Sequence, residues 1–213
     1  MELTEDELIA AIRRVLSGEV PGVRIGIGDD AAVTDAGLGW QVLTTDMLVE
    51  GVHFDRGSIS PRDLGAKSIV VNVSDIAAIA ASPRYALVSL GVPTEIEAAW
   101  VIELYGGMRA ACDEYALGLV GGDTNRAEAV VISVTVVGEV APGHAVTRSG
   151  ARPGDLVVVT GSLGAAGGGF VLSRAHPSKV AGALSAPWGR ELLGALARPV
   201  ARWARARRSG RRA

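Results

Sequence analysis

Four places along the chain carry aspartates whose neighbours suit the binding of a metal ion. They are the adjacent pair Asp29–Asp30, Asp46, Asp75 and Asp123. Adjacent carboxylates repel each other, and no Lys or Arg follows the pair within four residues. Oxygen ligands favour Mg²⁺, and threonine hydroxyls stand beside two of these sites: Thr44, Thr45 and Thr124. For the Gly-Asp-Asp stretch taken alone, the alternative is a solvated turn.

Asp75 stands out because it falls within an apolar helix. Ser60 as the cap and Pro61 as the first helical residue predict a helix that runs to about Ala81. Asn72 and Asp75 are three residues apart, which predicts one shared face. An aspartate in a largely buried helix is costly unless it is paired or metal-bound. The alternative is an ion pair between Asp75 and a Lys or Arg from elsewhere.

Two further aspartates follow predicted strands. The run Trp40–Thr45 predicts a strand that ends at Asp46, and Leu117–Val120 predicts a short strand leading through Gly122 to Asp123. Loops after strands commonly carry functional residues. The pattern therefore predicts that both acids face a shared site.

The remaining pattern predicts an alternation of helices and strands. We expect helices over about 4–16 and Glu95–Tyr115, strands over Ala31–Thr34, Arg84–Val92, Ala129–Val140 and Asp155–Thr160, and a glycine-rich turn, Gly161–Phe170, that leads into a helix. Turn residues at Pro142-Gly143 predict a boundary. The expected organisation is an N-terminal domain over 1–141, the start of a second domain over 142–197, and a disordered basic tail over 198–213.

Composition narrows the functional classes. Hydrophobic residues make up 48% of the 213 residues, which is enough for a substantial core, and the single Cys112 excludes an intrachain disulfide. The acidic start and the lack of an apolar run of roughly 18 residues predict a cytoplasmic protein without a membrane partner. Seven of the 21 basic residues lie in 198–213, so the rest of the chain is acidic, which argues against nucleic acid as a partner.

Several Mg²⁺ ions in one site suit a polyphosphate substrate, because they neutralise phosphate charge and align the reacting groups. Arg148, in a glycine-flanked turn, can contact a phosphate with its planar fork of donors. Its alternative role is that of an ordinary surface arginine.

Five ordered motifs resemble thiamine-monophosphate kinases, which belong to the superfamily of aminoimidazole ribonucleotide synthetase and selenophosphate synthetase. The resemblance covers about residues 1–175. The motifs are Gly26-Ile-Gly-Asp-Asp-Ala-Ala-Val33, Thr44-Thr-Asp46 with Gly51-Val-His-Phe54, Asp63-Leu-Gly-Ala-Lys67 with Val71-Asn-Val-Ser-Asp-Ile-Ala-Ala78, Gly121-Gly-Asp-Thr124, and Thr147-Arg-Ser-Gly-Ala-Arg-Pro-Gly-Asp155.

The resemblance implies an α+β fold: an N-terminal mixed-sheet domain that pairs across a homodimer, followed by an incomplete second α/β domain. It implies Mg²⁺-assisted, in-line transfer of the ATP γ-phosphate to thiamine monophosphate, giving thiamine diphosphate. By position, Asp30, Asp46, Asp75 and Asp123 would bind Mg²⁺, with Thr44 and Thr45 assisting and Asp29 as a further candidate. Tyr105, Gly122, Asp123 and Arg148 would contact ATP, and His53 would contact thiamine monophosphate. Without the resemblance, Tyr105 is an ordinary packing residue and His53 an unremarkable histidine. No general base is expected, because the acceptor is already an anionic phosphate oxygen.

Two other functions stay open. The family's later Ser-Asp-Gly-Leu and Gly-Glu-Asp-Tyr-Glu motifs do not occur in this sequence. One alternative is therefore a non-catalytic, dimerising remnant that binds Mg-nucleotide. The other is an ATP-dependent synthetase of the same superfamily with another substrate, which would need a Cys or Lys near the start for its chemistry.

Overall fold

The computed structural model describes residues 5–21, 23–25, 33–34, 37–147, 151–175 and 177–202. The chain divides into two compact units, which we describe separately. Unit 1 comprises Met1–Val146 and Ala201–Ala213, and unit 2 comprises Thr147–Val200. The domain limits expected from the sequence stay a prediction.

Unit 1 contains all the strands of the described chain and three helices. The helices are α1 (Glu5–Val15), α2 (Pro61–Ala78) and α3 (Ala98–Tyr115). The strands are β1 (Val23–Ile25), β2 (Val33–Thr34), β3 (Trp40–Val49), β4 (Ser82–Val92), β5 (Gly118–Arg126) and β6 (Val131–Val140). Strands β1 and β2 form a small antiparallel pair, and the other four form one mixed sheet. The α+β class predicted from the sequence is confirmed.

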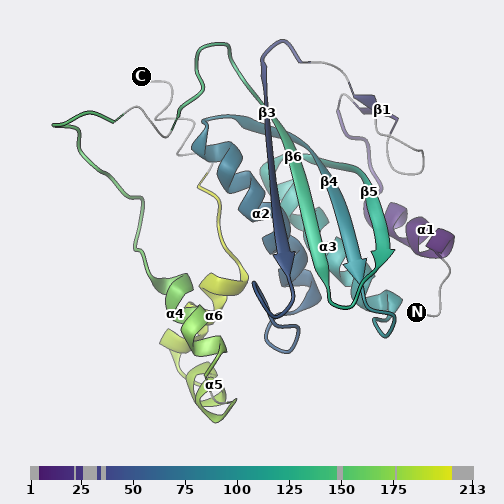
Figure 1. Ribbon diagram of the computed structural model, residues 1–213, viewed down its shortest axis with the longest axis vertical. Helices are drawn as coiled ribbons and strands as arrows, with labels where there is room; N and C mark the ends of the chain where they lie inside the picture. Colours follow the sequence, from purple (N-terminus) through teal and green to yellow (C-terminus); the bar gives the residue numbers. More distant parts are fainter. Residues whose placement is uncertain are drawn as a thin grey trace. The chain divides into compact units, whose positions relative to one another are not determined.

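The mixed sheet has the order β3-β6-β4-β5. Strand β6 runs antiparallel to both neighbours, whereas β4 and β5 are parallel. Helices α2 and α3 lie against one face of this sheet (Figure 1). Residues alternate strictly along β6: Ile132, Val134 and Val136 are buried, and the residues between them are only partly so. This alternation places the core between the sheet and the two helices.

Helix α2 begins as the sequence predicts. The Ser60 hydroxyl accepts a hydrogen bond from the Asp63 amide at 3.1 Å, and Pro61 is the first helical residue. Helix α2 then packs closely on α3 through two glycines. A Cβ atom added to Gly65 would lie 1.9 Å from the Leu104 carbonyl oxygen, and one added to Gly107 would lie 1.8 Å from that of Arg62. Only glycine permits backbones to approach so closely.

Two strands are longer than the sequence suggests. Strand β3 continues to Val49 and β5 continues to Arg126, so Asp46 and Asp123 lie within strands and not after them. The extension of β3 follows from its unbroken pairing with β6, from Trp40–Val140 to Val49–Val131. Strand β5 passes an irregularity beside Ala86–Leu87 and then pairs with β4 as far as Arg126.

Unit 2 contains three helices: α4 (Ala165–Ser173), α5 (Pro177–Leu184) and α6 (Pro187–Ala197). The helix predicted after the glycine-rich turn is present as α4, but it begins at Ala165, within the range Gly161–Phe170 that was predicted as the turn. The strand predicted over Asp155–Thr160 is wrong, because these residues form no strand. They are exposed throughout and have no neighbouring strand in the described part of the chain to supply hydrogen bonds.

In the described residues, no helix combines the length and apolar character that crossing a bilayer requires.

Candidate functional site

The described site is centred on three oxygen-bearing side chains between β3 and α2. The Thr44 hydroxyl donates a 2.9 Å hydrogen bond to Asp75 Oδ2, which joins the strand to the helix. Asp46 lies two residues beyond Thr44, so its side chain points to the same face of the sheet. Partial burial and the nearby charge of Asp75 raise the pKa of Asp46, and His53 lowers it by a smaller amount. Thr44, Asp46, Asp75 and His53 therefore form one electrostatic group.

The position of His53 is fixed by a tight turn directly after β3. The His53 amide donates to the Val49 carbonyl oxygen at 2.9 Å, and the Val49 amide donates to His53 Nδ1 at 3.1 Å. Since Nδ1 accepts this bond, the proton of the neutral ring lies on Nε2. The imidazole can thus offer an N–H donor to an anionic ligand.

Further residues hold this turn in place, and sequence reasoning missed them. Glu50 accepts hydrogen bonds from Arg56 Nε and, at 3.1 Å, from the Val130 amide. Arg56 also forms a weaker ion pair with Glu95, with 3.9 Å between Nη2 and Oε1. In the sequence Glu50 and Arg56 stand six residues apart on either side of His53, and this spacing by itself predicts no contact between them.

Thr45 points away from this group. Its hydroxyl donates to the Val134 carbonyl oxygen at 3.1 Å and accepts from the Thr135 hydroxyl at 3.2 Å. Neighbouring residues of a strand face opposite sides of a sheet, so Thr44 and Thr45 cannot both face α2. The structure places Thr44 beside Asp75. Thr45 lies on the face of the sheet opposite α2 and α3, which we call the uncovered face.

Asp123 also lies on that uncovered face. Asp123 is in register with Ser89 of β4, Ser89 with Ser133 of β6, and Ser133 with Met47 of β3. Residues in register point to the same face of the sheet, so Asp123 shares the face of Met47. Asn125 Nδ2 donates a 2.6 Å hydrogen bond to Asp123 Oδ2, a contact that sequence reasoning missed. Asp123 is therefore not part of the group formed by Thr44, Asp46 and Asp75.

Tyr105 approaches β5 from the core. Its side chain is buried on α3, and this burial raises its pKa to about 12. A hydrogen bond with Thr124 lowers the pKa, and the charge of Asp123 raises it further. Gly122 lies directly against β4, because a Cβ atom there would be 1.9 Å from the Val88 carbonyl oxygen. Tyr105 of α3 therefore lies beside the stretch of β5 that carries Gly122 and Asp123.

Three predicted residues, Asp29, Asp30 and Arg148, lie outside the described residues. Within the part of the chain that the structure describes, no three His, Cys, Asp or Glu side chains are grouped so that they could hold a metal. The expectation that Asp75 is buried is wrong: Asp75 is exposed, whereas Asn72 is fully buried with no partner for Oδ1. The alternative role for Asp75 finds no support either, since no ion pair of the described residues includes it.

Asp46 and Asp75 nevertheless suit a hard cation. Mg²⁺ is usually held by only one or two carboxylates, with water and substrate phosphates completing its coordination. The pair offers two exposed carboxylates whose mutual repulsion a cation would relieve. The Nε2–H of His53 adds a donor for a phosphate oxygen nearby.

The comparison with known families identifies the class of this domain. The family described as AIR synthase related protein, N-terminal domain, matches residues 28–140, more than half of the chain. The chain belongs to this family, and the match includes the whole four-stranded sheet with α2 and α3.

Within that class the chain is similar to thiamine-monophosphate kinases, as its motifs predict. The enzyme of Bacillus subtilis (strain 168) is 43% identical over 152 residues, which are 70% of this chain and 47% of the relative. The crystal structure of thiamine-monophosphate kinase from Stenotrophomonas maltophilia K279a has a TM-score of 0.80 and 33% identity, covering 99% of this chain and 66% of that one. A structure of AaThiL complexed with AMPPCP and TMP has a TM-score of 0.69 and 37% identity, covering 97% and 62%. The chain spans about half the length of the curated relatives it matches.

Proposed function

We propose that this chain is the Mg-nucleotide-binding part of a thiamine-monophosphate kinase, which transfers the γ-phosphate of ATP to thiamine monophosphate. The observation that carries the proposal is the group formed by Thr44, Asp46, Asp75 and His53, which offers ligands for a cation beside a donor for a phosphate. The ligands of AaThiL, AMPPCP and TMP, support the same pair of substrates.

In this proposal Asp46 and Asp75 hold Mg²⁺, with Thr44 fixing the carboxylate of Asp75 by its hydrogen bond. Asp29 and Asp30 are further proposed ligands of this site. Asp123 and Thr45 lie on the other face of the sheet and are proposed ligands of a separate Mg²⁺ ion. Tyr105, Gly122, Asp123 and Arg148 are proposed contacts of ATP. Mg²⁺ would neutralise phosphate charge when bound. The chain's own part is to position the two phosphates, and His53 donates a hydrogen bond from Nε2 to the phosphate of thiamine monophosphate.

The proposal is tested by two measurements on the same preparation. A coupled assay measures thiamine diphosphate formed from ATP and thiamine monophosphate, and calorimetry measures AMPPCP binding with and without Mg²⁺. Turnover supports the proposal. Mg-dependent AMPPCP binding without turnover supports the non-catalytic alternative, and absence of both contradicts the proposed site.

The role of His53 predicts a selective loss of affinity. We expect His53→Ala to weaken the binding of thiamine monophosphate, measured with Mg²⁺ and AMPPCP present, by about tenfold or more, because a hydrogen bond to a charged group is lost. His53→Gln should recover part of this loss, since its amide can still donate. Affinity for AMPPCP alone should not change; an equal loss for both ligands would show that His53 only supports the fold.

The raised pKa of Asp46 predicts opposite effects on stability and on metal binding. A carboxylate whose pKa is raised in the folded state destabilises that state when the pH lies above the raised pKa. This destabilisation is lost as the pH falls from the raised pKa to the usual pKa of the carboxylate. Asp46→Asn should therefore stabilise the metal-free chain at neutral pH, by up to about 1 kcal/mol for an exposed charge. It should also weaken Mg²⁺ binding and reduce the decline in Mg²⁺ affinity at acidic pH. Thermal unfolding with and without Mg²⁺ at several pH values checks both effects.

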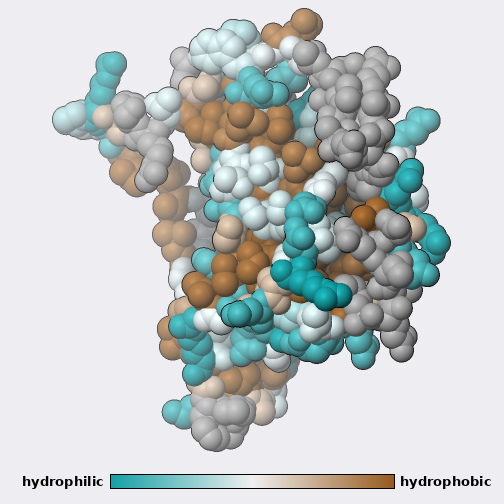
Figure 2. All heavy atoms as spheres, turned by 45° about the vertical axis from the view of Figure 1, so that its right-hand side comes forward, coloured by the Kyte–Doolittle hydropathy of each residue, from teal (hydrophilic) through white to brown (hydrophobic). Residues whose placement is uncertain are grey.

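We also propose that the uncovered sheet face binds a second copy of the chain. Three large apolar side chains are exposed on it: Leu43 (65%), Met47 (53%) and Leu87 (39%). Figure 2 shows hydrophobic areas at the surface between polar ones. We expect sedimentation to show a dimer and Leu43→Glu to shift it to a monomer; a monomeric parent chain would contradict the proposal.

A further inference from the structure

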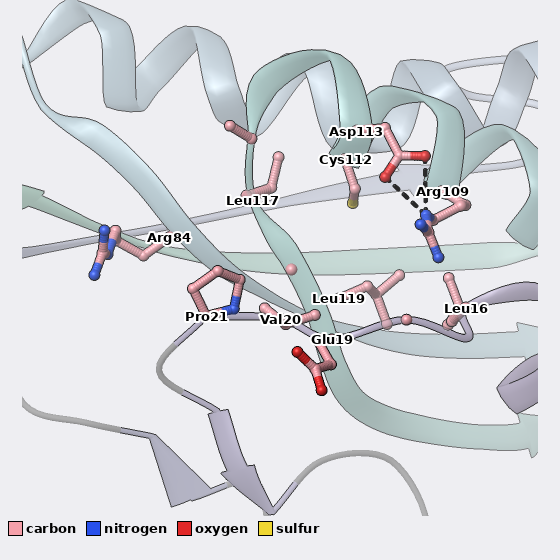
Figure 3. A pocket seen from close by; sticks show the side chains of 13 residues that line it. Leu16, Glu19, Val20, Pro21, Arg84, Arg109, Cys112, Asp113, Leu117 and Leu119 are labelled. Atoms are coloured by element: carbon pink, nitrogen blue, oxygen red, sulfur yellow. Dashed lines mark hydrogen bonds and ion pairs between the residues drawn. The ribbon is translucent and has the colours of Figure 1, made fainter.

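A cavity of about 290 Å³ lies in unit 1 between residues 16–21, the end of α3 and the start of β5 (Figure 3). Its volume is near the lower limit, about 300 Å³, of pockets that bind small molecules. Its apolar wall is formed by Leu16, Val20, Cys112, Leu117 and Leu119. None of the described residues assigned to the Mg-nucleotide site lines it. Gly118 of the cavity precedes Asp123 by five residues of β5, a distance of roughly 16 Å along a strand.

The outer wall of this cavity, residues 16–21, is held at three points. Arg109 Nη1 donates to the Ser17 carbonyl oxygen at 2.6 Å, and the Tyr85 hydroxyl donates to the Pro21 carbonyl oxygen at 3.3 Å. Between them Val20 packs on Gly118, where an added Cβ atom would lie 2.2 Å from Val20 Cγ1. Since the wall is held at both ends and in its middle, the space behind it is a built feature of the fold.

The polar group that the cavity presents is the guanidinium of Arg109. Its Nε donates to both carboxylate oxygens of Asp113, at 2.8 and 2.9 Å, and Nη1 is bound to Ser17. Nη2 has no hydrogen-bond partner among the described residues. In Figure 3 this guanidinium points from α3 toward the outer wall. A ligand can therefore gain a hydrogen bond here without displacing a described protein partner.

The charges that line the cavity argue against an ionic ligand. Arg84 and Arg109 are balanced by Glu19 and Asp113. Arg109 is already neutralised by Asp113, and Arg84 lies 3.7 Å from Glu139. The Glu19 side chain points away from Cys112 (Figure 3). Charge balance at the rim and an apolar wall favour a neutral ligand.

We propose that this cavity is a binding site, separate from the Mg-nucleotide site, for a small, uncharged, mostly apolar molecule with one hydrogen-bond acceptor. The apolar body packs on Leu16, Leu117 and Leu119, and the acceptor takes a hydrogen bond from Arg109 Nη2. Water beside the apolar wall finds few polar partners there, so an apolar group that displaces this water gains affinity. The proposal does not depend on the proposed kinase activity.

Three probes of equal ring size test the ligand class on the intact chain. They are quinoline, which is neutral with one acceptor, naphthalene, which has no acceptor, and 2-naphthoate, which is anionic. We expect quinoline to shift the methyl NMR signals of Leu16, Val20, Leu117 and Leu119, with the core methyls of Leu90 and Ile132 unchanged. Naphthalene should bind about tenfold more weakly, because it cannot accept the hydrogen bond. Tighter binding of 2-naphthoate, equal binding of naphthalene, or shifts that are absent or include the core methyls would overturn the proposal.

Two variants locate the site independently of the probes' chemistry. Leu16→Trp adds bulk at the cavity wall and should abolish the quinoline shifts at Leu117 and Leu119. Arg109→Met keeps the apolar stem of the side chain and should remove the preference for quinoline over naphthalene, with Asp113→Asn as the control that retains the donor. Unchanged quinoline binding in Leu16→Trp would place the probe elsewhere. The comparison of probes on the parent chain stands even if a variant does not fold.

Discussion

Replacing Asp75 with Asn should abolish Mg-dependent binding of AMPPCP while leaving the chain folded. Asp75 is exposed on α2, and its Oδ2 accepts a hydrogen bond from Thr44 that an Asn oxygen can also accept. The substitution therefore removes a charge without removing packing. Removing a proposed metal ligand should weaken Mg²⁺ binding by more than the roughly 10–100-fold cost of losing a residue that only hydrogen-bonds to a ligand. Calorimetric titration of AMPPCP in the presence of Mg²⁺ measures the loss.

The control for this experiment is Glu103→Gln, which removes an exposed carboxylate from α3. We expect it to leave both nucleotide binding and thermal unfolding unchanged. The free energy of unfolding of Asp75→Asn should be equal to that of the parent or slightly higher, because the substitution relieves the repulsion between Asp46 and Asp75. If Asp75→Asn retains Mg-dependent binding, or unfolds far more easily than the parent, Asp75 has a structural role and the proposed metal site is wrong.

Local sequence signals predicted the elements that have strong caps and clear periodicity. The cap at Ser60 and Pro61 predicted the start of α2, and the valine-rich run Ala129–Val140 predicted β6. Strand ends were less predictable, since β3 and β5 continue as long as a neighbour supplies hydrogen bonds. Helix α6 was missed although Pro187 is its first residue and Trp188, Leu192 and Leu196 recur at helical spacing, because its composition, rich in Ala, Arg and Trp, was taken as a loss of pattern. The strand expected over 155–160 shows the reverse error, in which apolar composition alone was taken as a strand signal.

The site was predictable in residue type and less so in geometry. Thr44, Asp46 and Asp75, which the resemblance assigns to one site, lie near one another, and their role as ligands stays a prediction. The reason given for Asp75 was wrong, since it is exposed. The separation of Thr45 from Thr44 follows from strand alternation once Asp46 is known to be inside β3. The support of His53 by Glu50 and Arg56 depends on a turn whose shape no sequence pattern specified.

The contact between α2 and α3 predicts the largest loss of stability. At Gly65 and at Gly107 a Cβ atom would lie within 2 Å of a carbonyl oxygen of the other helix, and these oxygens belong to backbone that cannot rotate away. We expect Gly107→Ala and Gly65→Ala each to lower the free energy of unfolding by about 3 kcal/mol, at the upper end of overpacking costs. This loss exceeds the gain of roughly 1 kcal/mol that Ala brings inside a helix. Urea unfolding followed by circular dichroism measures both quantities.

Gly106→Ala is the matched control, one residue away on the same helix. Its added Cβ atom would meet only the end of the Arg62 side chain, at 3.4 Å, so the helix-forming preference of Ala should prevail and the variant should be more stable than the parent. The double variant Gly65→Ala/Gly107→Ala should cost less than the sum of the single variants, because one separation of the helices makes room for both methyl groups. A stability of Gly107→Ala equal to that of Gly106→Ala would mean that the helices do not touch through their backbones. Additive losses would mean that the two contacts are relieved by independent local shifts and not by a common movement of α2 and α3.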